Sequence, residues 1–200
     1  MGKSFTDSSG QTSPEILLGG HEAFTVFADP DLASCPAPLR FAPLDGATGS
    51  PLLLEFGPDN GPRWQGAFAG EPSGRYRTAV VGCADPNTAC VVSNGRAYLV
   101  DVSAPARFEV LPILPVTCVA TGPLHELVAL ASCTDVIAIG SGGVIWRARG
   151  VSKDGIRSLR VDPDGVRGRA WSPAAGEFDF ALAPPSGLRM PEPAGPADRS

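Results

Sequence analysis

The fold is decided by the stretch Glu177-Phe178-Asp179-Phe180-Ala181-Leu182, in which a large apolar side chain stands at every second position. Successive side chains of a β-strand point to opposite faces of a sheet. The alternation therefore predicts a strand with one face on a core and the other in water. Similar short runs predict further strands at 24–28, 39–42, 52–56, 64–68, 77–81, 88–92, 97–102, 108–111, 116–120, 127–131, 136–139, 144–148, 156–161 and 166–171.

Polar turns between these runs predict hairpins. Ser93-Asn94-Gly95-Arg96 contains Asn-Gly, the pair that tolerates the two positive φ angles of a type I′ turn. Asp162-Pro163-Asp164-Gly165 has proline and glycine at positions that suit a tight turn. The glycine-rich segment 140–143 is followed by a predicted strand, so it does not fit a phosphate-binding loop, which leads into a helix. We expect consecutive strands to pair antiparallel.

The composition also favours sheets. Glycine and proline supply 24 and 21 of the 200 residues, and only 18% of the residues are charged. This argues against a helical bundle, a coiled coil or a charged disordered chain. The length predicts one all-β domain over 21–183, after a flexible polar lead over 1–20 and before a proline-rich disordered tail over 184–200.

A faint internal repeat groups the predicted strands. Segments 77–111 and 116–148 each contain four predicted strands, and 156–182 reads as a shorter third copy. A proline lies in the first connection of each copy, at Pro86, Pro123 and Pro163. This spacing resembles the four-stranded blades of β-propellers and implies antiparallel, propeller-blade-like four-stranded units.

Two alternatives stay open at this point. Segment 24–68 fits a fourth copy only loosely, so a two-sheet β-sandwich competes with the blade arrangement. Residues 123–131 also fit a short helix, although the flanking segments favour a strand. In either arrangement we expect a core that includes Val100, Phe108, Val128, Ile137, Trp146, Phe178 and Phe180.

Basic charge is concentrated in one segment of an acidic chain. The net charge is −5, yet 147–169 holds seven basic and three acidic residues. Alternation places Arg147 with Arg149 on one strand face, and Arg167, Arg169 and Trp171 on another. These five residues are the candidate binding site, and an acidic protein or an anionic ligand is the candidate partner. The overall negative charge argues against nucleic acid.

The sequence contains few residues of the types that usually catalyse reactions or bind metals. His21 and His125 are the two histidines, and the best nucleophilic set combines Cys118, His125 and Asp135. The five cysteines are an odd number without Cys-x-x-Cys spacing. We therefore expect reduced, buried thiols, no metal site and no cofactor.

These features predict a non-enzymatic β-rich binding module of a soluble cytoplasmic protein. A hydrolase that uses Cys118 or a surface serine with His125 is the alternative. The sequence has no predicted membrane span or secretory signal, which is the basis for the cytoplasmic assignment. It specifies neither the ligand nor the oligomeric state.

Overall fold

The computed structural model describes residues 14–28, 38–42, 51–72, 76–122 and 126–183, and no helix lies in this part of the chain. Its strands are β1 (Glu15–Leu17), β2 (Phe24–Ala28), β3 (Leu39–Phe41), β4 (Leu52–Pro58), β5 (Trp64–Phe68), β6 (Ala79–Gly82), β7 (Thr88–Ser93), β8 (Arg96–Asp101), β9 (Phe108–Val110), β10 (Cys118–Thr121), β11 (Val128–Ala131), β12 (Val136–Gly140), β13 (Gly143–Ala148), β14 (Ile156–Asp162), β15 (Gly165–Ser172) and β16 (Gly176–Leu182).

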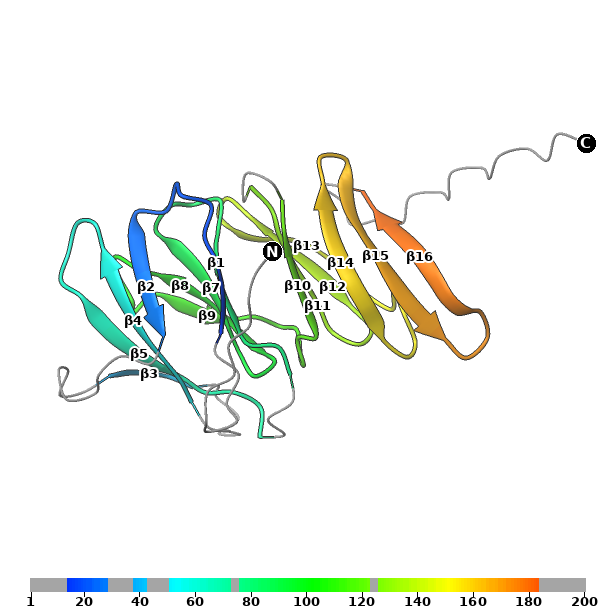
Figure 1. Cartoon of the computed structure of the whole chain (residues 1–200), viewed down its shortest axis with the longest axis horizontal. Coiled ribbons are helices and arrows are strands. Elements are labelled where there is room, and N and C mark those ends of the chain that lie inside the picture. Colours follow the sequence, from blue (N-terminus) through cyan, green and yellow to red (C-terminus); the bar gives the residue numbers. More distant parts are fainter. Residues whose placement is uncertain (1–13, 29–37, 43–50, 73–75, 123–125, 184–200) are drawn as a thin grey trace, which may run out of the picture.

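The strands form four sheets that lie side by side (Figure 1), and apart from β1 the sheets follow one another along the chain. The first sheet has the order β2-β4-β5-β3 and the second β1-β6-β7-β8-β9. The third is β10-β11-β12-β13 and the fourth β14-β15-β16. All neighbouring strands pair antiparallel except β1 with β6 and β3 with β5. The all-β prediction and the blade-like units are confirmed, and four sheets replace the two of the sandwich alternative.

The internal repeat corresponds to successive sheets. The two predicted four-stranded copies are β6–β9 and β10–β13, and the shorter third copy is the three-stranded fourth sheet. The first sheet also has four strands, but β3 precedes β4 in the chain and pairs parallel with β5 at the far edge. This order explains why segment 24–68 resembles the other copies only loosely.

The second and third sheets are buried on both faces. In β7, Ala89 and Val91 pack toward the first sheet, while Cys90 and Val92 pack toward the third. In the third sheet, Ile137 packs toward the second sheet and its neighbour Val136 toward the fourth. A strand covered on both sides needs no polar face, so these strands are continuous apolar runs.

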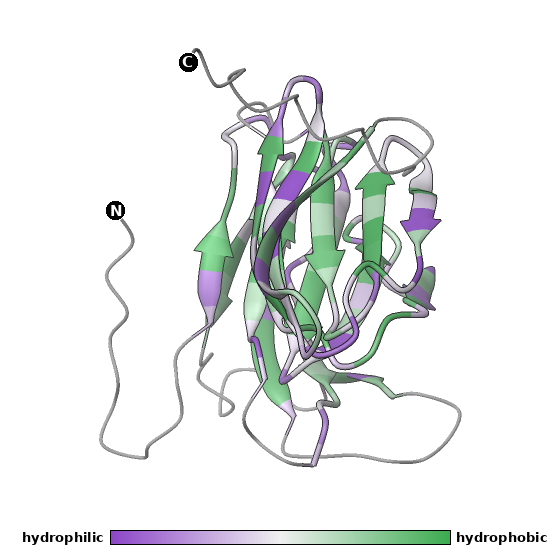
Figure 2. Cartoon of the chain, turned by 90° about the vertical axis from the view of Figure 1, so that its right-hand side faces the viewer, coloured by the Kyte–Doolittle hydropathy of each residue, from purple (hydrophilic) through white to green (hydrophobic). Residues whose placement is uncertain are grey.

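The fourth sheet has one buried and one exposed face. Phe180 and Leu182 of β16 pack against the third sheet, whereas Glu177 and Asp179 are exposed. Figure 2 views the molecule from this end and shows polar and apolar bands alternating along the strands. The alternating stretch 177–182 is therefore a strand of an end sheet.

The predicted core is largely correct. Val100, Val128 and Ile137 are fully buried, and Trp146 and Phe180 are nearly so. Phe178 is partly buried against the same cluster as Phe180. The prediction is wrong for Phe108, which is 41% exposed. Its strand β9 is the outer edge of the second sheet, so its ring lies at the rim rather than between sheets.

Two ambiguous segments are partly described. Val128–Ala131 is strand β11, so the helix alternative is wrong for these residues. Glu15–Leu17, inside the segment expected to be a flexible lead, forms β1 and pairs with β6. Its apolar Ile16 and Leu17 explain the difference, since a strand edge with apolar neighbours can order even a short segment. The predicted tail, 184–200, lies outside the described residues.

Candidate binding surfaces

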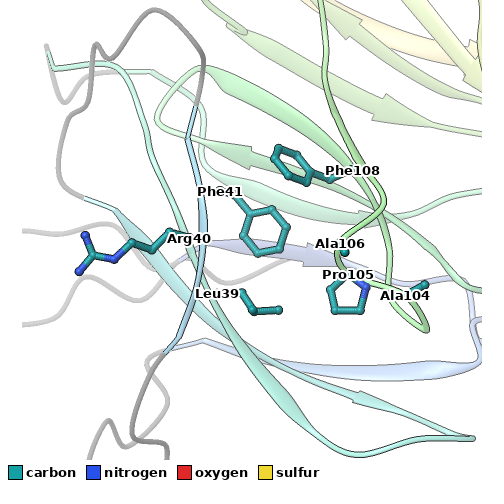
Figure 3. Close-up of a pocket in the computed structure, with 7 residues that line it drawn as sticks. All are labelled: Leu39, Arg40, Phe41, Ala104, Pro105, Ala106 and Phe108. Atoms are coloured by element: carbon teal, nitrogen blue, oxygen red, sulfur yellow. The ribbon is translucent and has the colours of Figure 1, made fainter.

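An apolar hollow of about 330 Å³ lies between the outer edges of the first and second sheets (Figure 3). Strand β3 forms one side, and the turn between β8 and β9 with the start of β9 forms the other. The lining residues are Leu39, Arg40, Phe41, Ala104, Pro105, Ala106 and Phe108. Arg40 is the one charged residue among them, and its guanidinium points away from the hollow in Figure 3. The surface offered to a partner is therefore apolar.

Stacked aromatic rings hold the floor of the hollow. Phe41 is 2% exposed, and its ring stacks on that of Phe68 with centroids 4.3 Å apart and an interplanar angle of 8°. Phe108 meets Phe41 edge-on at 5.0 Å. Such contacts favour a single ring arrangement. Leu39 and Phe108, which are 43% and 41% exposed, rise from this floor.

Hydrogen bonds hold the opposite wall in one conformation. Oδ1 of Asp101 accepts the backbone N–H groups of Ser103 at 3.0 Å and Ala104 at 3.1 Å. The N–H of Arg107 donates to the carbonyl of Ala104 at 2.7 Å. Pro105 lies inside this bonded turn, and proline further restricts the backbone. The hollow therefore needs little ordering to accept a ligand.

Both strands beside the hollow are edge strands. Among the described residues, β3 pairs only with β5 and β9 only with β8. An edge strand presents unpaired backbone N–H and C=O groups that can pair with another chain. Sequence reasoning missed this site because the alternation that includes Phe108 indicates which face a side chain occupies but not its distance from the sheet edge.

The structure brings together three of the five candidate residues from the basic segment. Arg167, Arg169 and Trp171 alternate along β15 and share the face turned away from the third sheet. Arg147 lies on β13 in the third sheet, opposite Ile137, whose side chain packs toward the second sheet. Cross-strand partners share a face, so Arg147 points away from the fourth sheet. Arg149, just beyond β13, is exposed.

Each of these arginines on a strand has an aspartate partner. Arg167 Nη2 lies 2.5 Å from Asp164 Oδ2, and Arg169 Nε lies 3.4 Å from Asp179 Oδ1. Arg147 Nη2 lies 2.6 Å from Asp135 Oδ2. The aspartates offset the basic charge locally, so an acidic partner would have to compete with them. Binding of such a partner through these residues stays a prediction.

Asp135 organises the connection between the third and fourth sheets. Besides Arg147, its carboxylate accepts the Gly150 N–H at 3.1 Å and the Thr134 hydroxyl at 3.0 Å. Burial alone would raise the pKa of Asp135. The hydrogen bonds from Arg147, Gly150 and Thr134 outweigh burial and hold that pKa below its usual value. The carboxylate of Asp135 is thus already engaged in bonds that stabilise the fold. In the hydrolase alternative the same carboxylate would have to orient His125.

The proposed nucleophile Cys118 is held in another contact. Cys118 Sγ donates to the carbonyl of Ile156 at 3.6 Å, and burial raises the pKa of this thiol. A raised pKa keeps cysteine in its unreactive form at neutral pH. His125 lies outside the described residues. His21 Nε2 is 3.0 Å from the Cys83 carbonyl oxygen.

The cysteines occupy different environments. Cys83 and Cys90 are buried, Cys118 is half-buried and Cys133 is exposed, and all four are free thiols. Burial raises the pKa of Cys83 to about 12. The expectation of buried thiols is thus wrong for Cys133, which follows β11 in an exposed turn; Cys35 lies outside the described residues. Within the described segments, no three His, Cys, Asp or Glu residues are grouped closely enough to hold a metal ion.

Comparisons with known proteins give fold-level similarity alone. No family model matches the chain, and no curated protein matches it. A chain in the crystal structure of a mitotic checkpoint complex matches over 70% of this chain and 48% of its own length, with 14% identity and a TM-score of 0.43. A chain of Kuenenia stuttgartiensis hydrazine synthase matches over 55% and 34%, with 13% identity and a TM-score of 0.36.

A third similar structure is that of S. cerevisiae dbp5 bound to nup159 and gle1. One chain of that structure matches over 72% of this chain and 45% of its own length, with 10% identity and a TM-score of 0.38. This chain thus spans less than half the length of each of these three chains. Across the described residues, no helix is long and apolar enough to cross a membrane.

Proposed function

We propose that this protein is a non-enzymatic binding module, and that the hollow between β3 and β9 binds an extended protein segment carrying apolar side chains. The observation that carries the proposal is the pair of exposed side chains, Leu39 and Phe108, on a floor of stacked rings. Contiguous exposed apolar surface is characteristic of interaction sites, and aromatic side chains often dominate binding energy.

An extended segment suits the backbone beside the hollow. A segment that paired with the free edge of β9 would gain main-chain hydrogen bonds, and every second side chain would face the hollow. The bonded turn around Pro105 supports this mode, because a wall already held in place loses little conformational entropy on binding. The proposed ligand is therefore a strand-forming segment with apolar residues at alternate positions.

Selection from a phage-displayed library of random peptides tests this function. We expect the full-length protein to enrich peptides with alternating apolar residues, and Phe108→Ser to weaken their binding by at least about tenfold. Val144→Ser is the matched control, because Val144 is 37% exposed on β13 and does not line the hollow. Circular dichroism checks that both variants fold.

Two results would contradict the proposal. One is a selection that enriches no peptide. The other is a selected peptide that binds the Phe108→Ser and Val144→Ser variants equally well. The cytoplasmic location remains a prediction from the sequence.

A further inference from the structure

The chain contains two Asn-Gly pairs, Asn60-Gly61 between β4 and β5 and Asn94-Gly95 between β7 and β8. In such a pair, the backbone nitrogen of glycine can attack the side-chain carbonyl carbon of asparagine. Glycine has no Cβ to hinder the approach. Strong hydrogen bonds of the asparagine amide and of the glycine N–H slow this reaction, because they must open before the nitrogen can reach the carbon.

The fold engages both reacting groups at Asn94. Its Nδ2 donates to the carbonyl of Glu71, and its Oδ1 accepts the N–H of Tyr76 at 2.9 Å. The N–H of Gly95 donates to the carbonyl of Arg77 at 2.8 Å. The φ angles of Asn94 and Gly95 are 40° and 84°, as predicted for the type I′ turn. These bonds engage the Asn94 amide and the Gly95 nitrogen with other groups, so the nitrogen is held back from the amide carbon that it would attack.

The side chain of Asn60 is unengaged within the described part of the chain. Asn60 and Gly61 are both exposed. Within the described residues, the Asn60 side-chain amide has no hydrogen-bond partner. The Gly61 N–H makes only the weak closing contact of the turn at Asp59-Asn60, in contrast to the 2.8 Å bond of the Gly95 N–H. At the start of this turn, the N–H of Asp59 donates to the carbonyl of Ala23 at 2.8 Å.

We propose that Asn60 is a site of spontaneous deamidation and that the fold protects Asn94 from the same reaction. Hydroxide removes the Gly61 amide proton, and the nitrogen forms a bond to Cγ of Asn60. Nδ2 takes a proton from the water just formed, the bond from Cγ to Nδ2 breaks, and Nδ2 leaves as ammonia while hydroxide is regenerated. Water then opens the cyclic imide at either carbonyl and leaves an aspartyl or an isoaspartyl residue at position 60.

Both products differ from Asn60 in charge, and the isoaspartyl product also differs in the path of the backbone. Each outcome adds one carboxylate beside Asp59 at the end of the first sheet. The isoaspartyl product also routes the main chain through the former side chain and so lengthens the turn. The modification would therefore mark the β4–β5 turn chemically without disturbing a buried group.

Peptide mapping by mass spectrometry tests the proposal on the full-length protein. The protein is incubated in mildly alkaline buffer prepared with heavy-oxygen water, so that new carboxyl groups carry the label. We expect conversion at position 60 to be at least about tenfold faster than at position 94, which corresponds to a local opening cost of about 1.4 kcal/mol or more at Asn94.

Two controls make the comparison specific. In denaturant the two sites should convert at similar rates, because both are Asn-Gly and the protecting bonds are gone. Gly61→Ala should slow conversion at position 60 in the folded protein, and the added Cβ would come no closer than 3.4 Å to Pro58 Cγ. Equal rates at the two sites in the folded protein would overturn the proposal. So would no labelling at position 60 over the time in which the denatured chain converts.

Discussion

Ile137 and Ile145 are two isoleucines of the third sheet whose environments differ. Ile137 on β12 is fully buried between the second and third sheets, whereas Ile145 on the edge strand β13 is 43% exposed. Ile137→Asp would bury an unpaired carboxylate and should cost at least about 4 kcal/mol of unfolding free energy. Ile145→Asp should cost less than about 1 kcal/mol. Denaturant unfolding measures both, and similar losses would contradict the assignment of the core.

Cys118 and Cys133 test the hydrolase alternative at the level of single thiols. Cys118 is half-buried with a raised pKa, and Cys133 is exposed. A thiol reagent at neutral pH should modify Cys133 rapidly and Cys118 slowly in the folded protein, since the thiolate is the reactive form. Peptide mapping reports each cysteine separately. Rapid labelling of Cys118 would argue against a purely binding function and in favour of the nucleophile.

Asp135 should make stability depend on pH in the acidic range. Its pKa is lowered in the folded protein, so its interactions stabilise the fold fully above the ordinary aspartate pKa and are lost as the pH falls through the folded value. Asp135→Asn should therefore lower stability at neutral pH and flatten the fall in stability on acidification. Denaturant unfolding at several pH values measures this, with exposed Asp59→Asn as the control. An unchanged pH profile would contradict the role of Asp135.

At the scale of the element, β15 and β14 carry the arginines that could meet an acidic partner. Arg160 and Arg169 are the better test positions, since their side chains are 66% and 64% exposed and their ion pairs are of the surface type. The double change Arg160→Glu with Arg169→Glu should abolish binding of a polyglutamate peptide and leave the melting temperature nearly unchanged. Binding is measured by fluorescence anisotropy of the labelled peptide.

The matched control for that prediction lies on the opposite end sheet. Arg40→Glu with Arg63→Glu makes the same change in charge at exposed positions of the first sheet and the loop beside it. Peptide binding that survives the β14–β15 change, or that both double variants lose equally, would remove the acidic-partner hypothesis. Arg147 and Arg167 are poorer choices, because Asp135 and Asp164 hold them at 2.6 and 2.5 Å.

Most elements could be predicted from the sequence, because alternation and turn chemistry are local. The strands at 24–28 and 64–68 and the Asn94-Gly95 turn agree with the structure residue for residue. Strand β1 was missed because three residues are too short a run to show a period. The edge position of β3 was missed because pairing with β5, across β4 in the chain, is not a local property.

At the scale of the whole molecule, the shared inner sheets predict a single cooperative unfolding transition. Leu54, Leu130 and Phe180 belong to the three successive core clusters between the four sheets. Each change to alanine should lower the same transition, by about 2–5 kcal/mol, because the second and third sheets each contribute to two clusters. Circular dichroism and tryptophan fluorescence should coincide. Separate transitions, one sensitive to Leu54 and another to Phe180, would contradict this.

The sequence alone determined that the chain forms strands and tight turns, and which side chains share a strand face, because both depend on the backbone over a few residues. Only the tertiary structure decided which faces are covered. It placed Phe108 at an open rim, engaged the side-chain amide of Asn94 but, among the described residues, not that of Asn60, and separated Arg147 from Arg167. Burial and bonding depend on which sheet lies beside a strand, and that neighbour is supplied by residues distant in sequence.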